Sequence, residues 1–323
     1  MPTSSEGAWG RAGLIGATGF VGGILARQRR FERTYSSQTI SDIAGERFDT
    51  LVCCGAPAVM WVANANPEAD RANLDLLADR IEQSDAARVV LISTIAVLDD
   101  MAAGYTEETA QYETVKAYGK NRRALEERVL SRPGSHVLRL PALFGPGLKK
   151  NFVFDILNPI PSFIKVEAFA AALARLEADV RAATEALFAL DDSMGAYRLD
   201  RAALGASPRR AEIEAAFAAA GLIAANFTNA DSEFQYYNLA RLADDIDTCV
   251  ARGIDVLHVS SPPWRAGDVY QTLTGRPFAN ASPPVTREDM RTIHAAVFGA
   301  SGDYLYTHAQ ARAELVDFAR ANG

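Results

Sequence analysis

Three glycines, Gly16, Gly19 and Gly22, follow one another at three-residue spacing near the start of the chain, between two segments of different character. Residues 11–15 before them are short and apolar, as in a buried strand, and residues 21–27 after them open a helix. In a strand–turn–helix unit of this kind, one glycine permits the tight turn, a second lets the backbone approach a phosphate, and a third lets helix and strand pack closely. Glycine-rich turns also occur as plain loops, so it is the setting that favours a dinucleotide-binding turn here.

Apolar strand-like runs alternate with helical ones over the first 150 residues, a pattern typical of a parallel sheet covered by helices. The expected strands are 14–15, 31–35, 50–54, 89–93 and 135–140, and the expected helices are 21–29, 70–83 and 114–130. Only about fifteen residues separate Tyr35 from Thr50, too few for a helix, a strand and another helix. We therefore expect the sheet to be abbreviated on that side.

The second half of the chain differs in composition and is rich in alanine and leucine. It predicts a long helix over 163–190, a strand over 224–228, a helix over 239–252, a strand over 254–260 and a helix that begins within 262–273 near Pro263. We expect residues 1–150 to form an α/β dinucleotide-binding domain, a doubly wound parallel sheet of Rossmann type. Residues 151–323 are expected to form a smaller substrate-capping region, from which about 236–262 return to the first domain.

The charge and cysteine content narrow the class of partner. A net charge of −7 disfavours nucleic acid and anionic membrane surfaces, and no apolar run is long enough to span a membrane. The adjacent Cys53 and Cys54 cannot readily bridge to each other, Cys249 is the third cysteine, and four scattered histidines show no metal-ligand spacing. We expect a cytoplasmic protein without metal that binds a small molecule, and a homodimer is compatible with these features.

Three residues are candidates for chemistry. Thr94 ends a predicted buried strand, and Tyr118 follows it 24 residues later, with Arg122 one helical turn beyond. Residues at i and i+4 share a helix face, and a guanidinium beside a phenol favours the phenolate form that a general acid/base needs. The Thr94 hydroxyl could bind the same substrate oxygen. In the alternative interpretation Tyr118 only packs, and Arg122 pairs with Glu126, which is also at i+4.

With these motifs the chain resembles the extended short-chain dehydrogenase/reductase family, in its NAD-dependent epimerase/dehydratase group. The likeness also covers residues 52–56, 67–73, 93–97, 138–141 and 144–147, and it is thin beyond residue 150. It implies an NAD(P)-dependent oxidoreductase or epimerase that acts on a sugar, a nucleotide-sugar or a similar carbonyl or alcohol compound. Thr94, Tyr118 and Arg122 would be catalytic. The implied cofactor-binding residues are Gly16, Thr18, Gly19, Phe20, Val21, Gly22, Gly55, Ala56, Pro57, Ser93, Tyr118, Arg122 and Pro141.

The chain departs from the family pattern at two places. Arg122 stands where the family has a lysine, and arginine has a fork geometry and a different reach. A non-catalytic dinucleotide-binding sensor or interaction protein of the same fold is therefore the second interpretation. The acidic residue expected after the second strand is absent, and Arg33, Ser36 and Ser37 lie there instead. These residues would accept a 2′-phosphate, which slightly favours NADP over NAD, although Arg33 could equally face solvent.

Overall fold

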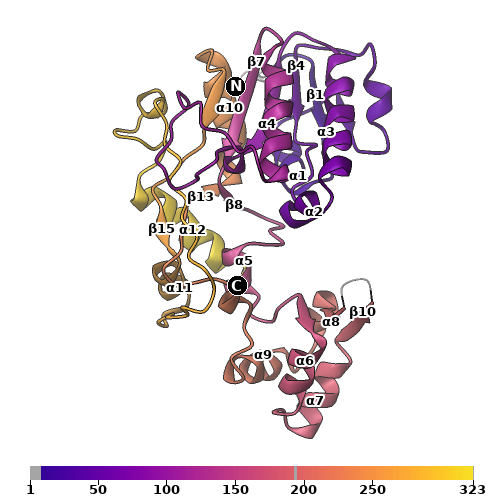
Figure 1. Ribbon diagram of the computed structural model, residues 1–323, viewed down its shortest axis with the longest axis vertical. Coiled ribbons are helices and arrows are strands. Elements are labelled where there is room, and N and C mark those ends of the chain that lie inside the picture. Colours follow the sequence, from indigo (N-terminus) through magenta and orange to yellow (C-terminus); the bar gives the residue numbers. More distant parts are fainter. Residues whose placement is uncertain (1–8, 193–194, 323) are drawn as a thin grey trace, which may run out of the picture. The chain divides into compact units, whose positions relative to one another are not determined.

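The structure, a computed structural model, describes residues 9–192 and 195–322 (Figure 1). The chain forms two compact units, and each is described by itself. The first, here called the sheet unit, contains the described residues up to Leu148 together with Glu233–Trp264 and Arg287–Phe318. The second, here called the helical unit, contains Lys149–Ser232, Arg265–Thr286 and the described residues after Phe318. The chain thus leaves the sheet unit and re-enters it twice.

The sheet unit is built on a six-stranded parallel sheet of order β14-β7-β6-β4-β1-β2. Its strands are β1 (Ala12–Ile15), β2 (Arg33–Tyr35), β4 (Thr50–Cys53), β6 (Val89–Thr94), β7 (Ser135–Leu140) and β14 (Val256–His258). The expected Rossmann-type parallel sheet is confirmed. Every residue of β1, β4 and β7 is buried, as expected for parallel strands that are covered on both faces.

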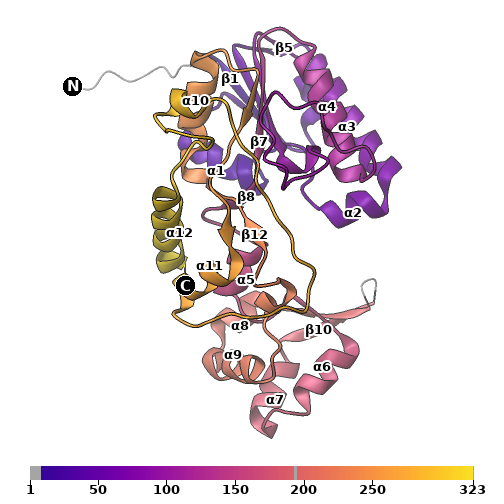
Figure 2. The ribbon, with the colours of Figure 1, turned by 60° about the vertical axis from the view of Figure 1, so that its left-hand side comes forward.

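Four helices cover the two faces of this sheet: α1 (Phe20–Gln28), α3 (Pro67–Glu82), α4 (Ala117–Leu130) and α10 (Leu242–Ala251). Figure 2 shows α3 and α4 on one side of the sheet and α1 and α10 on the other. Successive residues of a strand point to opposite faces, so Leu14 packs in the core beneath α1 and α10, whereas Ile15 packs in the core beneath α3 and α4.

The sheet is abbreviated beyond β1, as the short segment after Tyr35 predicts. That segment holds a 3₁₀ turn, η1 (Ile40–Ile43), and a two-residue strand, β3 (Arg47–Phe48), which pairs with β5 (Asp85–Ala86). β2 is therefore the edge strand. The other elements of this unit are α2 (Met60–Ala65), η2 (Ile95–Val97), β8 (Ala142–Phe144), β12 (Glu233–Phe234), β13 (Tyr236–Asn238), η4 (Leu239–Arg241), and η5 (Ala295–Phe298). β15 (Trp264–Arg265) and α12 (His308–Asn322) extend past its last residues.

The helical unit contains a three-stranded antiparallel sheet of order β10-β11-β9. Its elements are α5 (Phe152–Leu157), β9 (Phe163–Lys165), α6 (Val166–Leu173), α7 (Ala178–Glu185), β10 (Phe188–Asp191), β11 (Ala196–Leu199), α8 (Arg201–Ala206), α9 (Arg210–Ala219), η3 (Ala224–Phe227) and α11 (Ala266–Thr274). Its core is aromatic, with the Phe169 ring 4.7 Å from Phe188 and 4.4 Å from Tyr197.

Three predictions for the second half are wrong. The single helix over 163–190 is divided into β9, α6, α7 and β10, because Leu176 and Leu187 turn into the core between these elements. The strand expected over 224–228 is the 3₁₀ turn η3, whose first two alanines are buried. The helix expected from residue 262 begins only at Ala266, since Trp264 and Arg265 form β15. Across the described part of the chain, no helix is long and apolar enough to cross a membrane.

Candidate active site

The glycine turn connects the end of β1 to the start of α1, and two of its glycines are required by the fold. Gly16 has φ 88°, and a Cβ placed on it would lie 2.6 Å from the Cys54 carbonyl oxygen. A Cβ on Gly22 would lie 2.2 Å from the Gly16 carbonyl oxygen. The backbone N–H of Gly16 donates to the Tyr35 carbonyl at 2.7 Å, which ties the turn to the edge strand. The turn is therefore wedged between the end of β4 and the first turn of α1.

Gly19 has a different role, because the fold itself leaves space beside it. A Cβ there would meet only the Gly16 carbonyl oxygen, at 3.3 Å. Gly19 is the N-cap of α1, and no side chain caps this helix end. Thr18 and Gly19 are exposed, while Phe20 and Val21 are partly exposed. Unpaired N–H groups and the positive end of a helix dipole form an anion site, so this turn fits the pyrophosphate of a dinucleotide.

The ends of neighbouring parallel strands bring the predicted residues to one edge of the sheet. Ile15 is paired with Tyr35 on one side and with Cys53 on the other, and Cys53 is paired in turn with Leu91. The segments that follow these residues, which hold the glycine turn, Ser36–Ser37, Gly55–Pro57 and Thr94, therefore meet at the carboxyl edge. In open α/β sheets this edge is where ligands bind.

The segment after β2 is polar and exposed. Its Ser36 accepts the Gln38 N–H through Oγ at 3.2 Å, and its backbone N–H donates to Thr39 Oγ1 at 3.0 Å. Arg33 is exposed and forms no ion pair with any of the described residues. Glu32, the acid nearest to this strand, accepts the Ala12 N–H at 2.7 Å and so belongs to the sheet.

Ser93 and Thr94 at the end of β6 serve different purposes. The Ser93 hydroxyl donates to Glu126 Oε1 at 2.5 Å, on the face covered by α4. Thr94 Oγ1 accepts the Ala96 N–H at 3.2 Å and caps the turn η2. Within the described residues, the Thr94 hydroxyl proton has no acceptor, so it is available to a ligand, whereas the Ser93 proton is engaged.

Tyr118 is held beside this strand end by a close approach of α4 to η2. A Cβ on Gly119 would lie only 1.9 Å from the Ala96 carbonyl oxygen, so glycine alone permits this contact. The Tyr118 backbone N–H donates to Asn64 Oδ1 at 2.9 Å, which anchors the first turn of α4 to α2. The Tyr118 side chain is 8% exposed. Spacing on one helix predicted the residue, but the glycine beside it sets its position.

Arg122 is buried and fully engaged by the protein, its side chain being only 4% exposed. Its Nη1 lies 3.0 Å from Asp70 Oδ2 and its Nη2 lies 3.2 Å from Asp70 Oδ1. It also donates to the Tyr118 carbonyl at 2.9 Å and to the Pro57 carbonyl. The alternative pairing of Arg122 with Glu126 is therefore wrong.

The charge of Arg122 lies over the face of the Tyr118 ring, with Cζ 3.7 Å from the ring centroid. This is cation–π stacking. Asp70, on α3, is the residue that the sequence analysis missed, and its side chain is 7% exposed. Asn121 Nδ2 donates to the same carboxylate at 2.9 Å. Local spacing gives no signal for Asp70, because the contact depends on the packing of α3 against α4.

A second buried ion pair lies near the same strand end, on the face of the sheet that α4 covers. Arg139, on β7, and Glu126, on α4, are fully buried and bind each other at 2.7 Å. His258, on β14, lies 3.0 Å from Arg139 Nη1 through Nε2, and its Nδ1 lies 2.8 Å from the Arg291 carbonyl. Burial lowers the pKa of His258, so the neutral ring donates through Nδ1 and accepts through Nε2. Glu126 accepts hydrogen bonds from both Arg139 and Ser93.

Pro141, Cys53 and Cys54 lie at the ends of strands β7 and β4. Pro141 is buried between β7 and β8. Burial raises the pKa of the Cys53 thiol to about 12 and raises that of Cys54 as well, so neither is a nucleophile at neutral pH. No group of three or more His, Cys, Asp or Glu side chains in residues 9–192 and 195–322 is placed to hold a metal ion.

The parallel sheet and its glycine turn define a Rossmann-type α/β fold. No protein-family model matches the sequence, and no curated protein matches it. The fold is similar to that of a dTDP-4-dehydrorhamnose reductase from Yersinia enterocolitica, with a TM-score of 0.61 and 13% identity over 97% of this chain and 100% of that one.

Two further solved structures are similar. One is a UDP-galactose 4-epimerase, with a TM-score of 0.58 and 13% identity over 96% of this chain and 97% of that one. The other is RMD from Pseudomonas aeruginosa, complexed with NADPH, with a TM-score of 0.56 and 15% identity over 97% of this chain and 100% of that one. At this identity the comparisons show that the chain shares their fold.

Proposed function

We propose that the protein is an atypical member of the extended short-chain dehydrogenase/reductase family, an NAD(P)-dependent oxidoreductase or epimerase. Its substrate would be a sugar, a nucleotide-sugar or a similar carbonyl or alcohol compound. The observation that carries the proposal is the meeting of an uncapped glycine turn, the free Thr94 hydroxyl and Tyr118 at one sheet edge. The similar structures support it, since their names include a reductase, an epimerase and proteins complexed with NADPH, NADP and NAD.

The proposed cofactor site runs along the carboxyl edge of the sheet. The turn from Gly16 to Gly22 would hold the pyrophosphate, Gly55–Pro57 would lie beneath the adenosine ribose, and Pro141 would lie beside the nicotinamide. Arg33, Ser36 and Ser37 would accept a 2′-phosphate, which slightly favours NADP over NAD. When bound, the nicotinamide supplies or accepts the hydride.

The protein's own contribution is to bind the substrate oxygen and move its proton. The Thr94 hydroxyl, whose lone pair already receives the Ala96 N–H, would donate to that oxygen. Tyr118 would transfer the proton as general acid or base. Arg122 would act as a positioning residue, because it stacks on the Tyr118 ring and joins α4 to Pro57 and Asp70.

One observation favours the second interpretation, a dinucleotide-binding protein without catalysis. Asp70 compensates the charge of Arg122, and the guanidinium faces the ring rather than an open site. A residue so engaged cannot also bind a ribose as the family lysine does without giving up one of these contacts. Tight dinucleotide binding without turnover of any carbonyl compound would establish this interpretation.

The test is Tyr118→Phe, which keeps the ring and its stacking while removing the hydroxyl. We expect unchanged dinucleotide affinity and unchanged stability, with turnover lower by about 10²–10⁴-fold in an NADPH oxidation assay over a panel of carbonyl compounds. Tyr270→Phe is the control, because that ring stacks on Phe278 at 4.7 Å in the helical unit and lies outside the proposed site. An active enzyme whose rate is the same with Tyr118→Phe would exclude the mechanism.

A further inference from the structure

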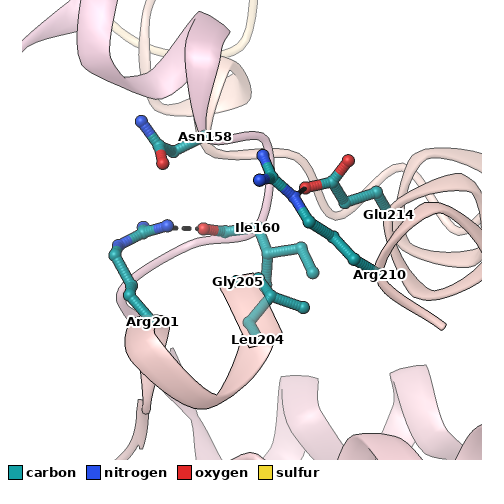
Figure 3. Close-up of a pocket in the computed structure, with 7 residues that line it drawn as sticks. All are labelled: Asn158, Ile160, Arg201, Leu204, Gly205, Arg210 and Glu214. Carbon is teal, nitrogen blue, oxygen red and sulfur yellow. Dashed lines mark hydrogen bonds and ion pairs between the residues drawn. The ribbon is translucent and has the colours of Figure 1, made fainter. Parts of the chain in front are cut away.

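A small cavity in the helical unit brings two arginines together (Figure 3). It has a volume of about 40 Å³ and lies between the segment after α5, which contains Asn158 and Ile160, and the helices α8 and α9. Arg201 from α8 and Arg210 from α9 line it, together with Glu214. A volume of this size admits a single small polar group and excludes a nucleotide.

Arg201 is half-buried and bonded only to neutral partners. Its Nη2 donates to the Ile160 carbonyl at 2.9 Å and to Ser162 Oγ at 2.9 Å, and Cζ lies 4.8 Å from the centroid of the Phe154 ring. Throughout the described residues, no carboxylate forms an ion pair with it. A charge removed from water is costly unless an opposite charge compensates it.

The acid that acts electrostatically on Arg201 compensates it incompletely. Asp155, on α5, is largely buried, and that burial raises its pKa to about 7, against the opposing effect of Arg201. Near neutral pH, Asp155 is therefore protonated for part of the time. Burial also lowers the pKa of Arg201, and the positive charge of Arg210 acts in the same direction. Burial thus disfavours the charged form of both side chains, and Arg210 adds a like charge beside Arg201.

Arg210 directs part of its guanidinium into the cavity. Its Nε donates to Glu214 Oε1 at 2.7 Å, so the carboxylate holds one edge of the group. Figure 3 shows the two terminal nitrogens of Arg210 pointing away from Glu214, toward the side where Arg201 lies. Both guanidinium groups therefore line the cavity with a single carboxylate, that of Glu214, on the side of Arg210 away from Arg201 (Figure 3), so the lining carries a net positive charge.

We propose that this cavity is a binding site for a small oxyanion, a phosphate or carboxylate group, held between Arg201 and Arg210. Two guanidinium groups can each donate charge-assisted hydrogen bonds to such a group, and these are among the strongest hydrogen bonds in proteins. The Asn158 side chain also lines the cavity, but its Nδ2 donates to the Phe154 carbonyl at 3.1 Å, so the two arginines are the donors to the anion. The site lies within the helical unit and does not depend on the activity proposed above.

The test is calorimetric titration of the full chain with inorganic phosphate and, separately, with acetate, at constant ionic strength. We expect saturable binding, and the tighter of the two probes identifies the ligand class. Arg201→Gln and Arg210→Gln should each weaken the affinity by about tenfold or more. Arg198→Gln is the matched control, because it removes the same charge from an exposed position on β11 and should change the affinity by less than about twofold.

Glu214→Gln provides a test with the opposite sign. Removing the carboxylate beside the anion should strengthen binding by about threefold, an effect that a purely structural cluster would not produce.

Binding of phosphate at the glycine turn would be distinguished from binding at this cavity, because its affinity would be lowered by Gly19→Val and unchanged by the substitutions at Arg201 and Arg210. If Arg201→Gln fails to fold, the more exposed Arg210 decides. Equal affinity in the natural chain and in Arg210→Gln, or no saturable binding of either probe, would overturn the proposal.

Discussion

Arg122→Lys is the substitution that most directly examines the departure of this chain from the family it resembles. The arginine spans both oxygens of Asp70 with two nitrogens and reaches the Pro57 carbonyl as well. An ammonium group has one nitrogen and cannot reproduce this fork. We expect the loss of one charge-assisted hydrogen bond, which lowers the free energy of unfolding by about 1.5–3 kcal/mol.

The size of this effect is bounded by two other variants. Asp70→Asn leaves the buried guanidinium without an opposite charge and should cost about 3–5 kcal/mol. Arg71→Lys is the control, since Arg71 pairs with Asp75 at 2.9 Å on the exposed face of α3, where an ion pair contributes about 0.3–0.5 kcal/mol.

Urea denaturation followed by circular dichroism measures the free energy of unfolding of all three variants. The slope of this free energy against urea concentration should be the same in each variant as in the parent. If Arg122→Lys costs no more than Arg71→Lys, the inferred anchoring of α4 is incorrect. The same variant examines function, because a working Tyr118 that only needs a nearby cation should keep measurable turnover with lysine at this position.

Three further outcomes are expected. Gly19→Val should preserve the fold and weaken NAD and NADP binding in calorimetry, and an affinity equal to that of the parent would place the cofactor elsewhere. Gly22→Ala should unfold the sheet unit, because its Cβ would lie 2.2 Å from the Gly16 carbonyl oxygen. Arg33→Ala should lower NADP affinity by about tenfold and leave NAD affinity unchanged, and a parent that binds NAD as tightly as NADP would refute the preference. Burial raises the pKa of Glu288 from 4.5 to about 7, so the folded state holds its proton longer than the unfolded chain, and stability should fall by about 3 kcal/mol as the pH rises from about 4.5 to 7. Glu288→Gln should reduce this fall in urea denaturation, and an unchanged pH profile would show that Glu288 ionises normally.

The sequence predicted the parts of the fold that local signals specify. The strands that end at Ile15, Cys53 and Thr94 are short apolar runs, and the glycine spacing marks the turn after the first of them. These signals also placed Thr94 and Tyr118 correctly at a strand end and on a helix. The close approach of Gly119, directly after Tyr118, to the Ala96 carbonyl could not be predicted in this way, because it depends on the packing of α4 against η2.

What the sequence did not predict depends on contacts between distant residues. Asp70 and Arg122 lie on different helices, so no spacing reveals their ion pair. The alanine-rich run around Leu176 has high helix propensity along its whole length, yet burial of Leu176 and Leu187 divides it. Tertiary packing overrides propensity in such segments, and periodicity alone could not have located the breaks.

The last strand of the large sheet has a consequence for the synthesis of the protein. β14 pairs with β7 through Val256, Leu257 and His258, whereas β7 itself ends at Leu140. While the ribosome adds the residues between these strands, β7 lacks its outer neighbour, and its apolar face and hydrogen-bonding edge can pair with other chains. We therefore expect a chain that stops before Val256 to aggregate, because the edge of β7 stays unpaired in it.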